Sequence, residues 1–129
     1  MSGRFLLDTN IVIAIFAEES AALDRVAAAE EAFVPAVALG ELYYGARKSV
    51  RAKTNIARIE AFAAAAAVLS CDAVTAQQYG RIKNDLRAKG RPIPENDIWI
   101  AAVAVQHGLT VVSRDDHFAD VTDLAREVW

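Results

Sequence analysis

The sequence has little cysteine and no long apolar run, and each shortage excludes a class of protein. Its single cysteine, Cys71, cannot form an internal disulfide. We interpret it as buried filler beside the apolar residues 67–69, because no histidine lies nearby in the sequence to activate it. The longest apolar stretches fall well short of the ~18 to 20 residues that a membrane span requires. Residues 1–4 lead into a predicted strand and have no signal-peptide pattern, so we expect a cytoplasmic protein.

Composition excludes both a disordered chain and a generally basic one. Hydrophobic residues make up 54% of the sequence and charged residues 24%, which is typical of a folded chain. The 129 residues fit a single domain, residues 1–129, with one core. No internal repeat or linker is visible. The net charge of −3 argues against a protein that binds nucleic acid through overall positive charge.

Positive charge is nevertheless concentrated in two segments. Residues 42–59 contain five basic residues and no acid, and residues 81–91 contain five basic residues and one acid. In an arbitrary protein these would be solvated helix faces. Beside an acidic metal site they would flank a phosphodiester substrate. The candidates for such contacts are Arg47, Lys48, Arg51, Lys53, Arg81, Lys83 and Arg87.

Short apolar runs alternate with segments of helical periodicity, which indicates an α/β fold with a parallel sheet. We predict five strands, near residues 4–7, 32–36, 66–70, 109–113 and 125–128. We predict helices near residues 10–17, 20–30, 38–48, 52–65, 75–89 and 95–107, and a helical turn near 116–119. Thr75 has the character of an N-cap, whereas Gly90 and Gly108 have that of helix stops.

Four acids lie at the ends or in the middle of apolar segments, where burying an ionised carboxylate costs free energy. They are Asp8, Glu41, Asp97 and Asp115. Acids are rarely buried without a partner, so a shared hard cation is a natural explanation. Three of them would lie near the carboxyl ends of parallel strands, where open α/β sheets form their sites. Such a cluster could not remain fully ionised without a cation, because neighbouring carboxylates raise one another's pKa.

The donor types indicate which metal the site would bind. Oxygen ligands without cysteine, and with neither histidine in a ligand-like pair, favour Mg²⁺ or Mn²⁺ over Zn²⁺. Other polar residues close to the acids could orient the carboxylates, although Thr9 and Asn10 could equally serve as ordinary helix caps. These candidates are Thr9, Asn10, Ser113 and Asp116.

Taken alone, most of the acids also have an ordinary interpretation. Asp8 could cap a helix, Asp97 could complement a helix dipole, and Asp115 could be a turn residue. Glu41 is harder to explain in this way, because a glutamate in mid-helix gains nothing from capping. We interpret His117 as a structural or edge residue rather than a general base, because a metal-activated water needs none.

Four motifs, in this order and spacing, resemble those of PIN-domain ribonucleases, and most closely the VapC toxins of type II toxin–antitoxin systems. The resemblance runs nearly from end to end. The motifs are Phe5-Leu6-Leu7-Asp8-Thr9-Asn10, Gly40-Glu41-Leu42-Tyr43-Tyr44-Gly45, Asn96-Asp97-Ile98-Trp99-Ile100-Ala101-Ala102 and Ser113-Arg114-Asp115-Asp116-His117-Phe118.

The resemblance implies a three-layer α/β/α fold around a central, mainly parallel sheet of about five strands. It also implies an endoribonuclease that hydrolyses RNA phosphodiester bonds with a water activated by Mg²⁺ or Mn²⁺. The catalytic acids and metal ligands would be Asp8, Glu41, Asp97 and Asp115. The fourth position is open between Asp115 and Asp116, and we choose Asp115 because it keeps the family's offset from His117.

The resemblance further implies a homodimer that a cognate VapB-type antitoxin neutralises, in a heterotetramer or a larger complex. An amphipathic antitoxin helix could dock around Phe16, Tyr43 and Tyr44, with an Arg or Lys entering the acidic site. Tyr43, Tyr44 and Trp99 could instead stack on bases, or belong to the core or the dimer surface.

The alternative is a binding module, either a catalytically inactive PIN-like domain or a receiver-type domain. A receiver would need an acceptor aspartate after the third strand and a lysine after the fifth. Asp72 is a weak acceptor candidate, and no suitable lysine follows Lys89. All four acids are present, which argues against an inactive domain.

Overall fold

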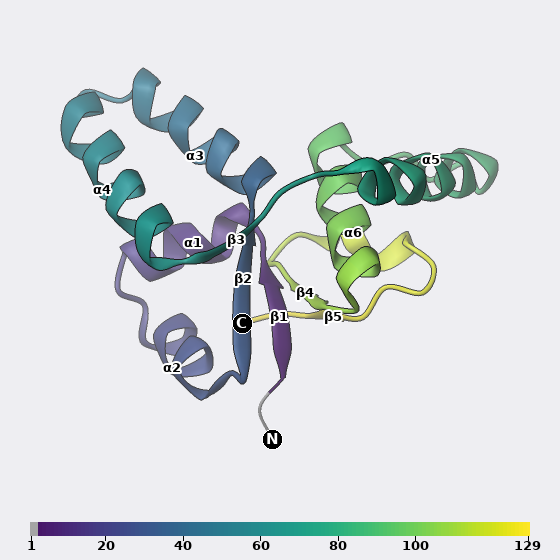
Figure 1. The fold of residues 1–129 in the computed structure, drawn as a ribbon, viewed down its shortest axis with the longest axis horizontal. Helices are drawn as coiled ribbons and strands as arrows, with labels where there is room; N and C mark the ends of the chain where they lie inside the picture. Colours follow the sequence, from purple (N-terminus) through teal and green to yellow (C-terminus); the bar gives the residue numbers. More distant parts are fainter. Residues whose placement is uncertain (1–2) are drawn as a thin grey trace.

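Five parallel strands form one sheet at the centre of the computed structural model, which describes residues 3–129 (Figure 1). The spatial order is β3-β2-β1-β4-β5, and every neighbouring pair is parallel. The predicted α/β fold with a parallel sheet is therefore confirmed. The strands are β1 (Arg4–Leu7), β2 (Glu31–Pro35), β3 (Ala67–Leu69), β4 (Thr110–Val112) and β5 (Arg126–Glu127).

The predicted helices are also present, and the ends of all predicted elements differ from the observed ones by at most two residues. None of the helices within residues 3–129 combines the length and the apolar character that crossing a bilayer requires. The helices are α1 (Thr9–Phe16), α2 (Ser20–Ala28), α3 (Ala36–Lys48), α4 (Ala52–Ala65), α5 (Ala73–Ala88) and α6 (Glu95–His107), followed by the 3₁₀ helix η1 (Asp116–Asp120).

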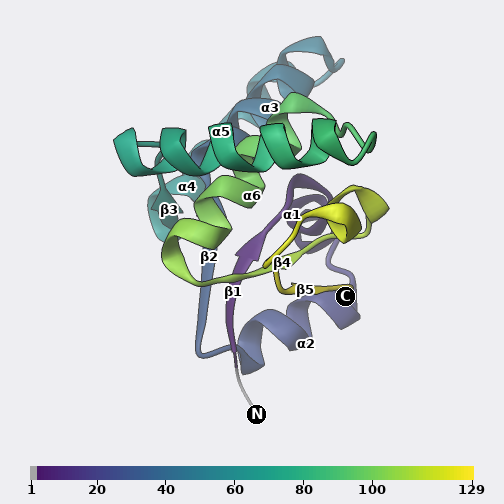
Figure 2. The same cartoon turned by 90° about the vertical axis from the view of Figure 1, so that its right-hand side faces the viewer.

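The two central strands divide their side chains between two apolar layers. Leu6 packs into the cluster formed with α5 and α6, whereas Leu7 packs with α1, α3 and α4. Val111 and Val112 of β4 divide in the same way, because successive side chains of a strand point to opposite faces. Figures 1 and 2 show α1 to α4 on one side of the sheet and α5 and α6 on the other. The result is the expected three-layer α/β/α arrangement.

One predicted cap was wrong. The N-cap of α5 is Asp72, whose side chain accepts a hydrogen bond from the Thr75 backbone nitrogen at 3.0 Å. In return the Thr75 hydroxyl accepts one from the Asp72 backbone nitrogen at 2.9 Å. This reciprocal capping box places the threonine three residues inside the helix. The stops at Gly90 and Gly108 are confirmed, since both residues have a left-handed φ, of 70° and 65°.

The interpretation of Cys71 as buried filler was also wrong, because its side chain is exposed. The preceding strand β3 lies at the edge of the sheet, and Ala67 and Val68 within it are exposed as well. Partial desolvation, together with the nearby Asp72 carboxylate, raises the pKa of the Cys71 thiol. A raised pKa disfavours the thiolate that a nucleophilic cysteine requires.

The order of the strands reverses beside β1. The chain passes from β1 to β2 and β3 on one side and then returns to β4 on the other. The backbone nitrogen of Asp8, just after β1, donates to the Val112 carbonyl of β4 at 3.0 Å. The segments that follow β1 and β4 are thereby held side by side at the point where open α/β sheets form their sites.

Candidate metal centre

Asp8 is a buried acid at the junction of β1 and α1. Its residue is 4% exposed, and its side chain accepts hydrogen bonds from the Thr9 backbone nitrogen at 2.8 Å and from the Ser113 hydroxyl at 2.7 Å. Burial raises the pKa of Asp8, these two hydrogen bonds lower it, and the charges of Glu41 and Asp115 raise it. Asp8 therefore caps α1, as the ordinary interpretation expects, and is also part of an acidic cluster.

Glu41 is joined to the first residue of α1. It lies on α3, and its Oε1 accepts a hydrogen bond from the Thr9 hydroxyl at 2.7 Å. Thr9 thus contacts one predicted acid through its side chain and another, Asp8, through its backbone nitrogen. This pair of contacts connects the carboxylate that follows β1 with the carboxylate on α3.

Asp97 is the second buried acid, in the first turn of α6. Its residue is 8% exposed, and its Oδ2 lies 2.6 Å from Nδ1 of His117. Burial raises the pKa of Asp97, the His117 hydrogen bond lowers it, and the charges of Asp8 and Asp115 raise it. The pKa of His117 is raised in turn, chiefly by its hydrogen bond to Asp97.

His117 is more closely involved in the site than the sequence interpretation allowed. Its Nδ1 also lies 3.7 Å from Oδ1 of Asp115. One ligand atom from each of Asp97, Asp115 and His117 lies within 4.8 Å of the others. The spacing of Asp115 and His117 around the start of η1 was the available signal in the sequence.

Ser113 organises the loop after β4. It is buried, it donates to Asp8, and its oxygen accepts from the Asn10 side-chain amide at 3.3 Å and the Asp115 backbone nitrogen at 3.0 Å. Asn10 in turn accepts from the Arg114 backbone nitrogen at 3.2 Å. Two of the predicted orienting residues, Asn10 and Ser113, are therefore hydrogen-bonded to each other within the site.

Three of the four predicted acids border a shared hollow of about 370 Å³. Glu41, Asp97 and Asp115 line it, together with His117 and residues 94–96. Asp8 is not among the lining residues, but its charge acts on Asp97. Asp116 is exposed at the start of η1 and does not line the hollow. The geometry therefore brings Asp115, rather than Asp116, to the other acids.

The basic candidates lie in two stretches of the chain, one from the end of α3 to the start of α4 and the other on α5. Arg47 and Lys48 occupy the last turn of α3, at the end remote from the sheet (Figure 1). Lys48 is seven residues beyond Glu41, or about 10 Å along the helix axis. Arg51 and Lys53 are exposed where α4 begins. On α5, Lys83 pairs with Glu95, and Arg81 donates to Gln78 at 3.1 Å. Contacts of these residues with RNA stay a prediction.

The four acids fit a divalent cation. Within residues 3–129, no lysine or arginine forms an ion pair with Asp8, Glu41, Asp97 or Asp115. Two of these carboxyls are buried with raised pKa values. Among the described residues only Asp97 of these two has a cationic partner, His117, which carries a charge only when it is protonated. A donor set dominated by carboxylate oxygens matches Mg²⁺ or Mn²⁺.

Comparison with known proteins gives consistent results over nearly the whole chain. Residues 5–124 match the family model of the PIN domain. The chain is 39% identical over 129 residues to "Ribonuclease VapC2" of Haemophilus influenzae, covering 98% of both chains. It is 35% identical to the "tRNA(fMet)-specific endonuclease VapC" of Shigella flexneri, again over 98% of each. Its fold is similar to a chain in the crystal structure of DNA-bound VapBC from Salmonella typhimurium, with a TM-score of 0.90, 31% identity, and coverage of 100% of this chain and 99% of that one.

Proposed function

The chain belongs to the PIN-domain family, and on this premise we propose that it is the metal-dependent endoribonuclease toxin of a VapBC-type toxin–antitoxin pair. The observation that carries the proposal is the meeting of four acids, from four separate parts of the chain, beside the reversal of strand order. Sites of this fold form there. The alternative, a binding module without activity, gives no reason for these four acids to converge at one point of the sheet.

The proposed ligands of Mg²⁺ or Mn²⁺ are Asp8, Glu41, Asp97 and Asp115. When bound, the ion would activate a water and stabilise the charge that develops on the phosphodiester. The protein's own contribution is to hold the carboxylates in place, which hydrogen bonds to metal ligands commonly do. The Ser113 hydroxyl holds Asp8, the Thr9 hydroxyl holds Glu41, and His117, with its proton on Nδ1, holds Asp97.

The proposed substrate is RNA, and transfer RNA is the first candidate to test. The Shigella flexneri relative is named for its action on tRNA(fMet), and the proposal extends RNA cleavage, but no particular RNA, to this chain. Because cellular RNA is the proposed substrate, we expect the protein to act in the cytoplasm.

The decisive experiment measures RNA cleavage by the purified chain with Mg²⁺ or Mn²⁺, and again with EDTA. We expect cleavage only with metal, and we expect Asp8→Asn and Asp97→Asn each to abolish it while the far-UV circular dichroism is unchanged. The matched control is Asp24→Asn, which removes one charge from the exposed face of α2 and should cleave normally. Full activity of both site variants would overturn the assignment, and absence of cleavage under every metal condition would favour a binding module.

The proposed partner is a VapB-type antitoxin, and the structure offers it a groove. Residues of α1, α3 and α4 line a hollow of about 290 Å³ that includes Ile13, Phe16 and Leu42 and reaches Glu41. Its apolar lining suits one face of an amphipathic helix. Of the three aromatic residues considered from the sequence, Phe16 lines this groove and Tyr43 and Tyr44 do not.

We further propose that the chain forms a homodimer, and a heterotetramer or a larger assembly with its antitoxin. Light scattering on the purified chain, alone and with the antitoxin, measures both masses. Crystal structures of VapBC complexes are among the similar folds. A short upstream reading frame that encodes a DNA-binding antitoxin would identify the partner.

A further inference from the structure

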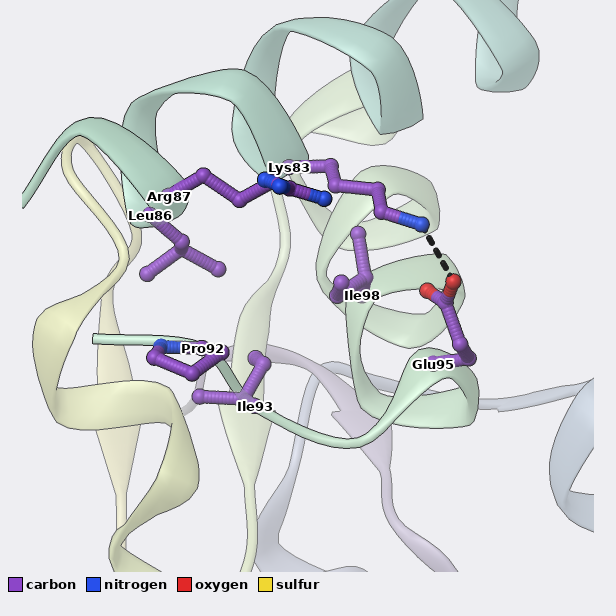
Figure 3. Close-up of a pocket in the computed structure, with 7 residues that line it drawn as sticks. All are labelled: Lys83, Leu86, Arg87, Pro92, Ile93, Glu95 and Ile98. Atoms are coloured by element: carbon purple, nitrogen blue, oxygen red, sulfur yellow. Dashed lines mark hydrogen bonds and ion pairs between the residues drawn. The ribbon is translucent and has the colours of Figure 1, made fainter. Parts of the chain in front are cut away.

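A second hollow, of about 440 Å³, lies between α5 and the start of α6 (Figure 3). Pro92, Ile93 and Ile98 give it apolar surface. Lys83 and Arg87 extend over it from α5, as Figure 3 shows, and the Glu95 carboxylate stands at one side. Apolar walls with a few placed charged groups are typical of small-ligand sites of this size.

The wall of this hollow is held in shape by the way α5 ends. Gly90 adopts a left-handed φ of 70°, and the Arg91 backbone nitrogen donates to the Leu86 carbonyl at 2.9 Å. This turn reverses the chain beneath α5. Pro92 and Pro94, whose rings fix φ, then lead into α6. This part of the wall is therefore already ordered before a ligand binds, which reduces the entropic cost of binding.

The hollow lies beside the acidic site, and the two share one lining residue. Glu95 lines both the second hollow and the one bordered by Asp97 and Asp115. Glu95 and Asp97 lie in the same first turn of α6. An RNA strand with one phosphate at the acids would therefore bring a neighbouring nucleotide to the second hollow.

The charged groups of this hollow differ in whether they already have a partner. Glu95 is bonded to Lys83, and the Tyr79 hydroxyl donates to its Oε1 and Oε2 at 3.0 and 2.9 Å. The Tyr79 ring stacks on Trp99 with centroids 4.1 Å apart, which occupies one face of the tryptophan. Among the residues that the structure describes, the exposed Arg87 has no ion-pair partner. Glu95 is thus a fixed acceptor and Arg87 an available cation.

We propose that this second hollow binds the base of a nucleotide adjacent to the cleaved phosphodiester, an inference that rests on the proposed ribonuclease function. Ile93 and Pro92 contact the flat face of the base, and Arg87 pairs with a phosphate oxygen. Glu95 accepts a hydrogen bond from the edge of the base. Proteins read single-stranded RNA by bonding to such unstacked edges. Because an ionised carboxylate only accepts, the position of the N–H donors on each base decides how well that base bonds to Glu95.

A binding experiment tests the site without requiring cleavage. The four nucleoside 5′-monophosphates are titrated into the full chain in EDTA, and the methyl signals of Ile93 and Ile98 are followed by NMR. We expect saturable shifts at both, and we expect Arg87→Glu to weaken binding about tenfold by repelling the phosphate. The matched control is Arg126→Glu, which reverses the same charge at an exposed position of β5 outside the hollow and should change the affinity less than about twofold. Silent Ile93 signals, or equal effects of the two reversals, would overturn the site.

Cleavage then tests the reading of the base. A single-stranded RNA with randomised positions is digested with Mn²⁺, and the ends of the products are sequenced. We expect a base preference at one fixed distance from the cut, and we expect Glu95→Gln to change that preference alone. An unaltered preference in Glu95→Gln would overturn the role of Glu95. No cleavage by the unaltered chain would overturn the ribonuclease proposal instead, because nucleotide binding is measured separately.

Discussion

At the residue scale, Asp8 is subject to two opposing effects on its ionised form. As the cap of α1 it is bonded to the Thr9 backbone nitrogen and to the Ser113 hydroxyl, which stabilise its ionised form. As a buried acid close to Glu41 and Asp115 it is destabilised when ionised. Burial outweighs the hydrogen bonds, since the net effect is a raised pKa. Without metal, the site is therefore strained at neutral pH by its own charge.

This conflict predicts a dependence of stability on pH. A folded-state pKa of Asp8 above its ordinary value of 3.8 means that the folded protein holds this proton more tightly than the unfolded chain does. The Asp8 contribution to stability is therefore lost as pH rises through the folded pKa, and it is regained as pH falls toward 3.8. In EDTA at pH 7, Asp8→Asn should raise Tm by a few degrees, since about 1 kcal/mol shifts Tm by roughly 2 to 8 °C.

Thermal unfolding from pH 4 to pH 7 checks this. The advantage of Asp8→Asn should shrink as pH falls toward 4 and the native carboxyl takes up its proton, and saturating Mg²⁺ should stabilise the unaltered protein more than the variant. Asp24→Asn, exposed on α2, should follow the unaltered protein throughout. A Tm of Asp8→Asn below that of the unaltered protein at pH 7 would show that capping outweighs charge repulsion.

The sequence could predict which acids meet but not what holds them. Asp8 and Asp115 follow strands whose carboxyl ends share one edge, so their proximity follows from the parallel sheet. The contact between His117 and Asp97 depends instead on how η1 packs against α6. No local pattern encodes that packing. The choice of Asp115 over Asp116 is consistent with which of the two lines the hollow.

At the element scale, the start of α5 depends on one buried hydroxyl. Thr75 is fully buried, and besides completing the capping box its hydroxyl bonds to the Gln106 side chain on α6. The sequence motif Asp72-Ala73-Val74-Thr75 contains two possible caps, and the helix begins at the one that leaves Thr75 in the third position. The link to Gln106 could not be predicted, because it joins residues 31 positions apart.

Replacing Thr75 by Val tests this link with little change of side-chain shape. The variant leaves the Asp72 backbone nitrogen without its acceptor and removes the bond to Gln106. We expect a loss of about 1 to 3 kcal/mol in the free energy of unfolding, measured by urea denaturation. Thr75→Ser keeps the hydroxyl and should lose less. If Val matched the unaltered protein, the hydroxyl would contribute nothing to the junction of α5 and α6.

The end of α3 allows a second test at this scale. Arg47, Lys48 and Arg51 cluster there, beyond Glu41 on the same helix and the turn that follows it. Replacing all three with Ala should weaken RNA binding and reduce the salt slope by up to about 2, since each contact with a single strand contributes about 0.7. Fluorescence anisotropy of a labelled RNA across a KCl series measures both quantities.

The control for this charge change uses basic residues away from the end of α3. The control variant replaces Arg4 of β1, Arg25 of α2 and Arg126 of β5 with Ala, which removes the same total charge. Its salt slope should stay close to that of the unaltered protein. Equal slopes in all three proteins would mean that the end of α3 is a solvated face, as the ordinary interpretation of this basic segment holds.

At the scale of the whole molecule, three hollows open around one acid cluster. Glu41 borders both the acidic hollow and the apolar groove between α1, α3 and α4, and Glu95 borders both the acidic hollow and the second hollow beside α5. The layered fold was predictable from the alternation of strands and helices. The arrangement of the hollows was not, because it depends on the packing of side chains from helices far apart in the sequence.

Because Glu41 borders both the groove and the acidic hollow, we expect the binding of the antitoxin and the binding of the metal to affect each other. An antitoxin helix in the groove that includes Phe16 and Leu42 would place its residues beside Glu41. An Arg or Lys on that helix would pair with the carboxylates in a partly desolvated site and would lower their affinity for a cation. Linkage requires the effect to be reciprocal, so the metal must weaken antitoxin binding by the same factor.

Calorimetry measures this coupling directly. A peptide of the antitoxin is titrated into the protein across a series of Mn²⁺ concentrations at constant ionic strength, so that screening stays fixed. We expect its affinity to fall between about 5- and 150-fold as the metal site fills, the range of ordinary coupling energies. In Glu41→Gln the dependence should flatten, because the residue that borders both hollows no longer carries charge. If the affinity for the unaltered protein does not change with Mn²⁺ concentration, the antitoxin blocks the substrate from a distance and does not enter the acidic hollow.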